Sequence, residues 1–306
     1  MRLSFIGLEI ILNKKNSKKS ISFNDINYMN NETLLYIKKL SKKEIDSRTE
    51  ELIKTCETDV GKIKQILNDK GIVIIKDFVP EVTIDKISQD LKNIREEISS
   101  FISTNNTFKD NANFFFQKDN AKFTNYSELA NYKKTVANIR GGQDKGMIDI
   151  FNVDKCNYSL GNILIPFFNQ KIIFDILSEE SSNLNPTNLN LYLNNDITKT
   201  RGFHVDTYNK KIKIFLYLED CLNLDDGPYT YVKESHINSR FAKINQCISS
   251  NLSNYTETPF VSLENITPVL AKRGTLVISD QSGSHRGFPQ ALGHKRAVAV
   301  MNYIKL

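Results

Sequence analysis

The feature that most constrains the fold is a series of short segments in which apolar and polar residues alternate. In the segment 187–194, Leu189, Leu191 and Leu193 alternate with asparagines and a tyrosine. Residues two apart share one face of a β-strand, so this segment predicts a strand with one face in a core and the other in solvent or a cavity. Similar segments lie at 211–218, 259–263, 274–280 and 296–304. Turns rich in Gly, Pro, Asn and Asp separate them, which predicts an antiparallel sandwich or barrel.

Helices are predicted to pack against this β-structure. After Pro80, apolar residues recur every three or four positions on one stripe, which indicates a long amphipathic helix with a buried face. A helix from Val60 ends before Gly71 and leads into an apolar strand at 72–75, and a further packing helix is expected over 161–177. The polar segment 236–255 is predicted to be a loop. The apolar stripe consists of Ile84, Ile87, Leu91, Ile94, Ile98 and Phe101.

Two units of unequal size follow from this pattern. Residues 1–60 form a polar, lysine-rich extension with helical segments, and residues 61–306 form one large domain. No internal repeat or linker divides the second unit. The chain is therefore predicted to be mainly β with packing helices, in the α+β class.

The chemistry of the chain centres on His204 and Asp206, which follow the strand that ends near residue 194. Their side chains leave the same face of an extended segment. Two histidines and one carboxylate, with the other metal positions open, form the facial site of non-haem Fe(II) oxygenases. We expect His285 to be the third ligand because it lies between two predicted strands. His236 and His294 remain as alternatives.

One cation has a distinctive place relative to this site. Arg296 opens the last predicted strand, eleven residues after His285. A buried guanidinium there can hold a dicarboxylate through two hydrogen bonds, which a lysine cannot do. We therefore predict that Arg296 faces the interior of the barrel, on the same side as Val298 and Val300.

The His-x-Asp pair, the distal His285 and the arginine eleven residues later resemble the phytanoyl-CoA dioxygenase-like family of Fe(II)- and 2-oxoglutarate-dependent oxygenases. The segment 68–80, with the amphipathic helix after it, is similar to the opening of that family. The Asp226-Gly227-Pro228 turn, followed by Ser235 and His236, is similar to its mid-domain turn. Together these features cover about Gln65 to Leu306.

The resemblance implies a double-stranded β-helix, or jelly roll, with helices backing the larger sheet. It implies Fe(II) held by His204, Asp206 and His285, with 2-oxoglutarate bound by Arg296. It also implies O2 as oxidant and ascorbate as a supporting reductant. The expected reaction oxidises an unactivated C–H bond, by default through hydroxylation, and releases succinate and CO2. A cupin-type metal-dependent isomerase and a sugar-binding jelly-roll protein are the alternatives, and neither needs an inward Arg296.

Further residues are candidates for contacts in the site. Asn190 and Tyr192 share the polar face of the strand before the metal motif, so they are predicted to contact the co-substrate. Arg201 stands where many members of the family have a glutamine. Arg140 lies beside a glycine pair in a segment of weak periodicity. Both arginines are candidates for binding a small, anionic substrate.

Composition sets limits on location and partners. Cys56, Cys156, Cys221 and Cys247 are scattered without a metal-like spacing, which favours a reducing compartment. Glu9 interrupts the apolar N-terminal run, and no segment approaches the ~20 apolar residues of a membrane span. The net charge of +6 is spread over polar faces. We therefore expect a cytoplasmic protein with no nucleic-acid or membrane partner, and we leave its oligomeric state open.

Overall fold

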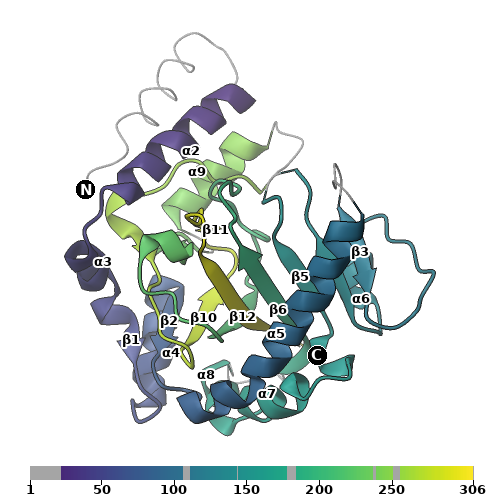
Figure 1. Cartoon of the computed structure of the whole chain (residues 1–306). Helices are drawn as coiled ribbons and strands as arrows, with labels where there is room; N and C mark the ends of the chain where they lie inside the picture. Colours follow the sequence, from purple (N-terminus) through teal and green to yellow (C-terminus); the bar gives the residue numbers. More distant parts are fainter. Residues whose placement is uncertain are drawn as a thin grey trace.

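Two facing β-sheets form the framework of the protein. The computed structural model describes residues 22–105, 111–142, 144–177, 184–236, 239–250 and 256–305. The expected N-terminal tail before residue 22 lies outside these ranges. Within the described residues, the large sheet has nine strands and the small sheet has three. All strand pairs are antiparallel except the one between β1 and β2. Figure 1 shows the two sheets and the helices around them.

The strands of each sheet come from distant parts of the chain. In spatial order, the large sheet contains β1 (Ile53–Lys54), β2 (Ile72–Ile75), β10 (Leu276–Asp280), β7 (Ile212–Tyr217), β12 (Lys295–Lys305), β6 (Leu184–Asn195), β5 (Ile148–Phe151), β4 (Val136–Ile139) and β3 (Ala112–Phe115). The small sheet contains β11 (His285–Gly287), β8 (Tyr229–Val232) and β9 (Ile266–Pro268). The predicted jelly-roll fold with helices against the larger sheet is confirmed.

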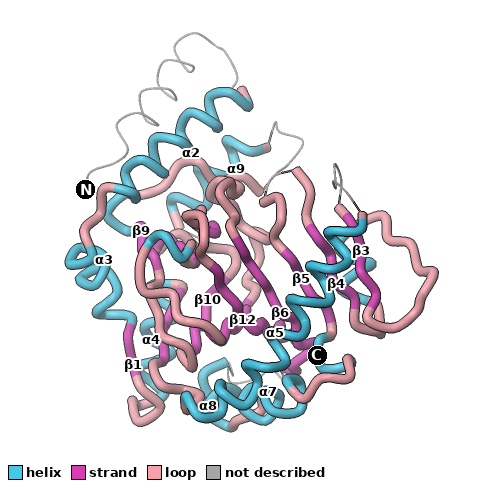
Figure 2. The backbone as a smooth tube through the Cα atoms, in the orientation of Figure 1, coloured by secondary structure: helices cyan, strands magenta, loops and turns pink. Residues whose placement is uncertain are grey.

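The outer face of the large sheet is covered by helices and forms the main core. Helix α5 (Glu81–Thr104) buries Ile84, Ile87, Leu91, Ile94 and Ile98, which confirms the predicted apolar stripe. These side chains pack against Ile214, Leu216 and other outward residues of the sheet. Figure 2 shows α5 crossing the strands, with α4 (Val60–Lys70), α7 (Leu160–Phe168) and α8 (Lys171–Leu177) nearby.

The expected single helix over 161–177 is two helices. Helix α7 ends at Phe168, α8 starts at Lys171, and polar Asn169 and Gln170 form the turn between them. The apolar periodicity does not reveal this break, because both helices bury apolar side chains in the same core. Among the described residues, no single helix is long and apolar enough to span a membrane. Only the pair α7 and α8 matches by length and composition, with a bend of 52°.

The N-terminal helices pack against the small-sheet side. Helices α2 (Phe23–Lys38) and α3 (Lys42–Thr49) each begin with a capping box, at Ser22 and Ser41. Ile37, Leu40 and Ile45 form a separate apolar cluster with residues of the jelly roll. The short helix η1 (Glu50–Leu52) then leads into β1, which joins the large sheet. The boundary at residue 60 stays a prediction.

Two local expectations are wrong. The segment expected as a loop contains helix α9 (Arg240–Ser249), which is capped by Ser239. Phe241, Ile244 and Ile248 recur at helical spacing, so the overall polarity of the segment hid an amphipathic helix. The strand expected at 259–263 is irregular, and β9 starts only after the short helix η4 (Leu263–Asn265).

The segment of weak apolar periodicity that contains Arg140 extends the large sheet. It supplies β3, β4 and β5 in a meander, with the short helix α6 (Tyr126–Asn131) between the first two. The helical turn η2 (Val153–Lys155) follows β5, and η3 (Leu224–Asp226) precedes the turn before β8. The meander widens the inner wall of the barrel beside β6.

Gly274 lies at the turn into β10, where the large sheet contacts the segment just before α5. A substitution there tests how closely the two are packed. The φ of Gly274 is +84°, and an added Cβ would lie 2.2 Å from the carbonyl oxygen of Val79, just before α5. Gly274→Ala should therefore lower the free energy of unfolding by about 2–4 kcal/mol, through backbone strain and this clash. Denaturant unfolding monitored by circular dichroism measures the change.

Gly293 is the matched control. It also has a positive φ, of +82°, but an added Cβ would meet nothing within 4 Å. Gly293→Ala should cost only the conformational strain, about 1–2 kcal/mol. Equal losses for the two variants would contradict the proposed contact between Gly274 and Val79.

Candidate metal centre and active-site cavity

Two histidines far apart in the sequence are joined by a backbone bridge. The N–H of His204 donates to the carbonyl of His285 at 3.0 Å, and the N–H of His285 donates to the carbonyl of His204 at 2.9 Å. The pair is an isolated antiparallel bridge between the loop after β6 and the first residue of β11. It holds the two imidazole rings with their centroids 4.7 Å apart.

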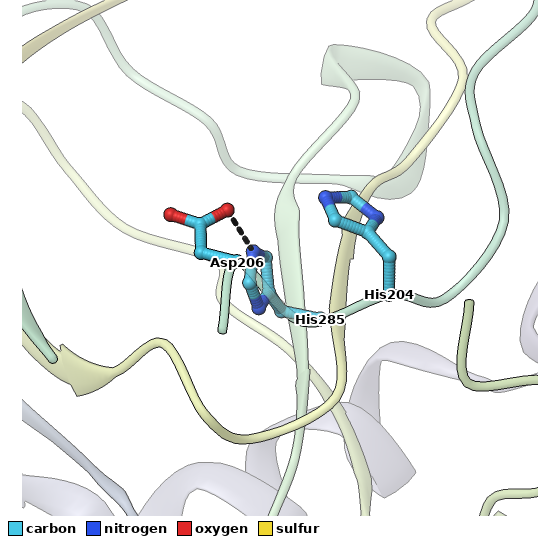
Figure 3. Close-up of side chains that lie close together, drawn as sticks. All are labelled: His204, Asp206 and His285. Carbon is cyan, nitrogen blue, oxygen red and sulfur yellow. Dashed lines mark ion pairs between the residues drawn. The ribbon is translucent and has the colours of Figure 1, made fainter. Parts of the chain in front are cut away.

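Asp206 completes the cluster. Its N–H donates to the carbonyl of Gln281 at 3.0 Å, which places the carboxylate next to the histidines. One potential ligand atom from each of His204, Asp206 and His285 lies within 4.8 Å of the others. Figure 3 shows the three side chains converging, with His285 Nε2 at 3.7 Å from Asp206 Oδ1. The spacing suits one metal ion held by all three.

Backbone carbonyls orient both imidazole rings. His204 Nδ1 lies 2.9 Å from the carbonyl oxygen of Gly202, and His285 Nδ1 lies 2.9 Å from that of Gly283. A proton on Nδ1 leaves the Nε2 lone pair of each ring free for a metal. The two rings therefore present the same nitrogen toward the cluster.

The charges of the cluster also suit metal binding. Burial, and then His285 and Arg201 nearby, hold the pKa of His204 well below its ordinary value. Burial opposes ionisation of Asp206, but Lys213 and His285 outweigh it and hold the pKa of Asp206 well below its ordinary value. A neutral imidazole and an ionised carboxylate are the forms that bind a cation. This donor set fits Fe(II) with open positions.

The two alternative histidines lie elsewhere. His236 Nε2 contacts the carbonyl oxygen of Asn68 at 2.8 Å, beside Gly71. His294 Nδ1 contacts Asp226 Oδ1 at 2.8 Å. Neither belongs to the cluster found among the described residues. The geometry therefore favours His285 as the third ligand.

The cluster opens into a large cavity between the sheets. The cavity has a volume of about 1390 Å³ and extends from the metal cluster to β4 and α6. Ligand pockets are commonly about 300–1,000 Å³, so this space can hold a co-substrate and a second molecule together. All eight residues predicted for the site line it, namely Arg140, Asn190, Tyr192, Arg201, His204, Asp206, His285 and Arg296.

Arg296 is a buried cation in the cavity wall. It pairs with Asn194 across the β12–β6 ladder and is 7% exposed, on the inner face with Val298 and Val300. Its Nη1 donates to the carbonyl of Gly227. Among the described residues, no carboxylate forms an ion pair with it. Because an unpaired buried charge is costly, this position suits an anionic ligand.

Asn190 and Tyr192 lie on the inner face of β6, as their alternation predicted. Asn190 Oδ1 accepts hydrogen bonds from the N–H of Asn152 at 3.2 Å and from Asn188 Nδ2 at 2.9 Å. Tyr192 lies next to Val298 across the β6–β12 ladder. A contact of either residue with the co-substrate stays a prediction.

The two arginines expected to bind substrate are already paired. Arg201 Nε donates to Glu257 Oε1 at 2.8 Å, and Arg140 Nε donates to Asp149 Oδ2 at 2.7 Å. Arg140 also lies 3.4 Å from Asp144. These carboxylates offset much of the charge that a substrate would meet. The role of both arginines in substrate binding stays a prediction.

Two further cations of the site were not assigned a specific contact from sequence. Lys213 Nζ lies 2.6 Å from Asp206 Oδ2, and Lys213 shares the inner face of β7 with Phe215 and Tyr217. The alternation of residues along β7 predicts that Lys213 is on the inner face, but it does not predict that Asp206 is its partner. Arg286 is 2% exposed, donates to Thr200 Oγ1 at 3.0 Å and leaves Nη1 without a partner. No periodicity marks Arg286.

Comparisons with known proteins support the fold. No protein-family model matches the chain, and no curated protein sequence matches it. Solved structures do match. The 2-oxoglutarate-dependent carbocyclase SnoK from nogalamycin biosynthesis has 12% sequence identity and a TM-score of 0.50, over 87% of this chain and 84% of SnoK. The chain therefore has the fold of these non-haem, 2-oxoglutarate-dependent enzymes.

Other solved structures show a weaker likeness. AviO1 from Streptomyces viridochromogenes Tue57 has 15% identity and a TM-score of 0.49, over 80% of this chain and 94% of AviO1. HygX from Streptomyces hygroscopicus, solved with nickel, 2-oxoglutarate and hygromycin B, has 10% identity and a TM-score of 0.43. That match covers 78% of this chain and 84% of HygX.

The metal cluster gives a direct prediction. Replacing His204, Asp206 or His285 with Ala should weaken binding of a divalent metal by at least about 100-fold, because each change removes one ligand. Anaerobic titration calorimetry with Fe(II) measures the affinity, and thermal unfolding checks the fold. His236→Ala and His294→Ala are the controls. Loss of binding in either control, with His285→Ala unaffected, would show that the third ligand is misassigned.

The ion pair of Arg201 gives a second prediction. Glu257 is 7% exposed, so Arg201→Gln should leave a buried carboxylate with a weaker partner and lower the free energy of unfolding by about 1–3 kcal/mol. Adding Glu257→Gln should recover much of that loss. Denaturant unfolding of both variants measures this. Unchanged stability of Arg201→Gln would instead favour a role outside the scaffold.

Proposed function

We propose that this protein is an Fe(II)- and 2-oxoglutarate-dependent oxygenase acting on an anionic small molecule. It oxidises an unactivated C–H bond and releases succinate and CO2, with hydroxylation as the default outcome. The observation that carries the proposal is the position of Arg296, a buried cation without a carboxylate, in the same cavity as His204, Asp206 and His285. Membership of the phytanoyl-CoA dioxygenase-like family is part of this proposal.

Each group in the cavity has a role in this scheme. His204, Asp206 and His285 would hold Fe(II), which, with 2-oxoglutarate bound, supplies O2 activation. Arg296 would pair with the distal carboxylate of 2-oxoglutarate, and Asn190 and Tyr192 would line its binding site. Ascorbate would keep the iron reduced. SnoK is a carbocyclase, so ring closure is a second outcome that this fold supports.

The charge of the cavity supports an anionic substrate. The cationic residues that line it are Arg140, Arg201, Lys210, Lys211, Lys213, Arg286 and Arg296. The acidic residues that line it are Asp144 and Asp206, and Asp149 and Glu257 pair with the lining arginines. Positive charge therefore remains in excess before any metal binds. An excess of one sign in a low-dielectric cleft attracts ligands of the opposite sign.

The two alternative functions do not account for this arrangement. A metal-dependent isomerase or a sugar-binding module could share the jelly roll and the histidines. Neither requires a buried, uncompensated guanidinium at the inner end of β12. A bound dicarboxylate would balance that charge, which is why the oxygenase is preferred.

Arg296 tests the proposal. Arg296→Ala should weaken the binding free energy of 2-oxoglutarate by ~2–5 kcal/mol, because one side of a buried charge pair is lost. Arg296→Lys should recover only part of the affinity, since an ammonium cannot make the two-pronged contact. Anaerobic calorimetry on the Fe(II)-loaded protein measures both, and the affinity for Fe(II) should change far less. Unchanged affinity for 2-oxoglutarate in Arg296→Ala would refute the co-substrate assignment.

Succinate release separates the reaction class from the alternatives. The Fe(II) protein with 2-oxoglutarate, O2 and ascorbate should form succinate. Anionic metabolites should stimulate succinate formation more than neutral analogues of the same metabolites. An isomerase or a binding module would form none.

A further inference from the structure

Lys213 contacts the metal cluster from the side opposite His285. Its Nζ lies 2.6 Å from Asp206 Oδ2, whereas His285 Nε2 lies 3.7 Å from Asp206 Oδ1. The two carboxylate oxygens therefore have different neighbours. The Lys213 side chain is 13% exposed, and Asp206 is the one carboxylate with which it forms an ion pair in the described ranges.

The backbone fixes this contact. Asp206 N–H donates to the carbonyl of Gln281 at 3.0 Å, and Gln281 N–H donates to the carbonyl of Lys211 at 2.7 Å. The loop that carries Asp206 and the residue just before β7 are thus both hydrogen-bonded to Gln281. Lys213 itself lies between Ser279 and Asn302 in the central part of the large sheet. The ion pair is built into the framework and is not a chance contact of two surface side chains.

Lys213 cannot duplicate the role of Arg296. On β12 the residue level with Lys213 is Asn302, six positions along the strand from Arg296. At about 3.3 Å per residue, their backbones are about 20 Å apart along the sheet. Of these two cations, Lys213 is therefore the one that pairs with Asp206.

We propose that Lys213 sets the coordination and the charge of the metal centre. By occupying Asp206 Oδ2, it leaves Oδ1 as the single oxygen that this carboxylate gives to a metal. Two neutral histidines, one carboxylate and a divalent metal carry one net positive charge, and the ammonium raises this to two. The anionic end of a co-substrate that faces the metal then meets this added positive charge, while Arg296 pairs with the distal carboxylate. Lys213 is thus a positioning residue, and its co-substrate effect rests on the proposed function.

Loss of the Lys213 charge should change the affinity for the metal and the affinity for 2-oxoglutarate in opposite directions. Without the ammonium, a metal cation meets less repulsion, and both oxygens of Asp206 become available to it. Lys213→Met should therefore bind Ni(II), an air-stable probe, about tenfold more tightly than the wild type, because a like charge close to the metal is removed. The Ni(II)-loaded variant should bind 2-oxoglutarate at least about tenfold more weakly, because one positive charge is missing. Titration calorimetry measures both affinities.

Two variants serve as comparisons. Lys213→Arg keeps the charge and should bind 2-oxoglutarate with nearly wild-type affinity. Lys295→Met removes a lysine whose side chain is 65% exposed and lies 3.5 Å from Glu219, so both affinities should stay at wild-type values. If Lys213→Met does not fold, Lys213→Gln replaces it with the same expectations.

The outcomes separate this inference from the proposed function. Weaker Ni(II) binding in Lys213→Met, with unchanged affinity for 2-oxoglutarate, would mean that Lys213 only holds Asp206 in place and would overturn the inference. Unchanged affinities for both would overturn it as well. If the wild-type Ni(II) protein fails to bind 2-oxoglutarate, the proposed function fails, and the Ni(II) comparison still tests the effect of Lys213 on the metal.

Discussion

The pair of backbone hydrogen bonds between His204 and His285 is the contact on which the site depends. It joins the loop after β6 to the first residue of β11, and so connects the ends of the two sheets. The two bonds fix the backbone positions of the two candidate ligand histidines. The peptide groups, and not the side chains, set the spacing of the rings. A metal would therefore find a site whose geometry is already held by the framework.

The second constraint is the cost of burying charge. Three cations in the cavity wall have a carboxylate partner: Arg140 has Asp149, Arg201 has Glu257, and Lys213 has Asp206. Among the described residues, Arg296 and Arg286 form no ion pair with a carboxylate, and a protein keeps such a buried group at a cost of several kcal/mol unless a ligand compensates for it. The difference between paired and unpaired cations is what distinguishes scaffold from binding residue. It also separates Arg296 from Arg140 and Arg201, although the sequence made all three candidates for binding anionic groups.

Sequence patterns were reliable where one physical effect dominates. The apolar stripe of α5 and the strict alternation of β6 each arise from burial of one face, and both elements formed as predicted. Helix α9 was missed because the segment is polar overall, although Phe241, Ile244 and Ile248 recur at helical spacing. Its buried face also includes Asn245, which is satisfied by the backbone at Phe241 and Phe260. Hydropathy scores such a residue as exposed, although its hydrogen bonds make it a good interior residue. The break between α7 and α8 was not predicted because both helices bury apolar side chains in the same core.

The sequence by itself determined strands β2, β6, β7, β10 and β12, the long packing helix and the identity of the candidate ligands, because periodicity and residue type are local properties. It also placed Arg296 on the inner face, since strand alternation needs no tertiary information. Only the tertiary structure decided that His285, and not His236 or His294, meets His204 and Asp206. That choice depends on how two distant segments pair through their backbones. Which cations are neutralised was likewise decided by the fold, because strand alternation gives the face of a side chain and not its partner across strands or loops, as for Arg140 with Asp149 and Arg201 with Glu257.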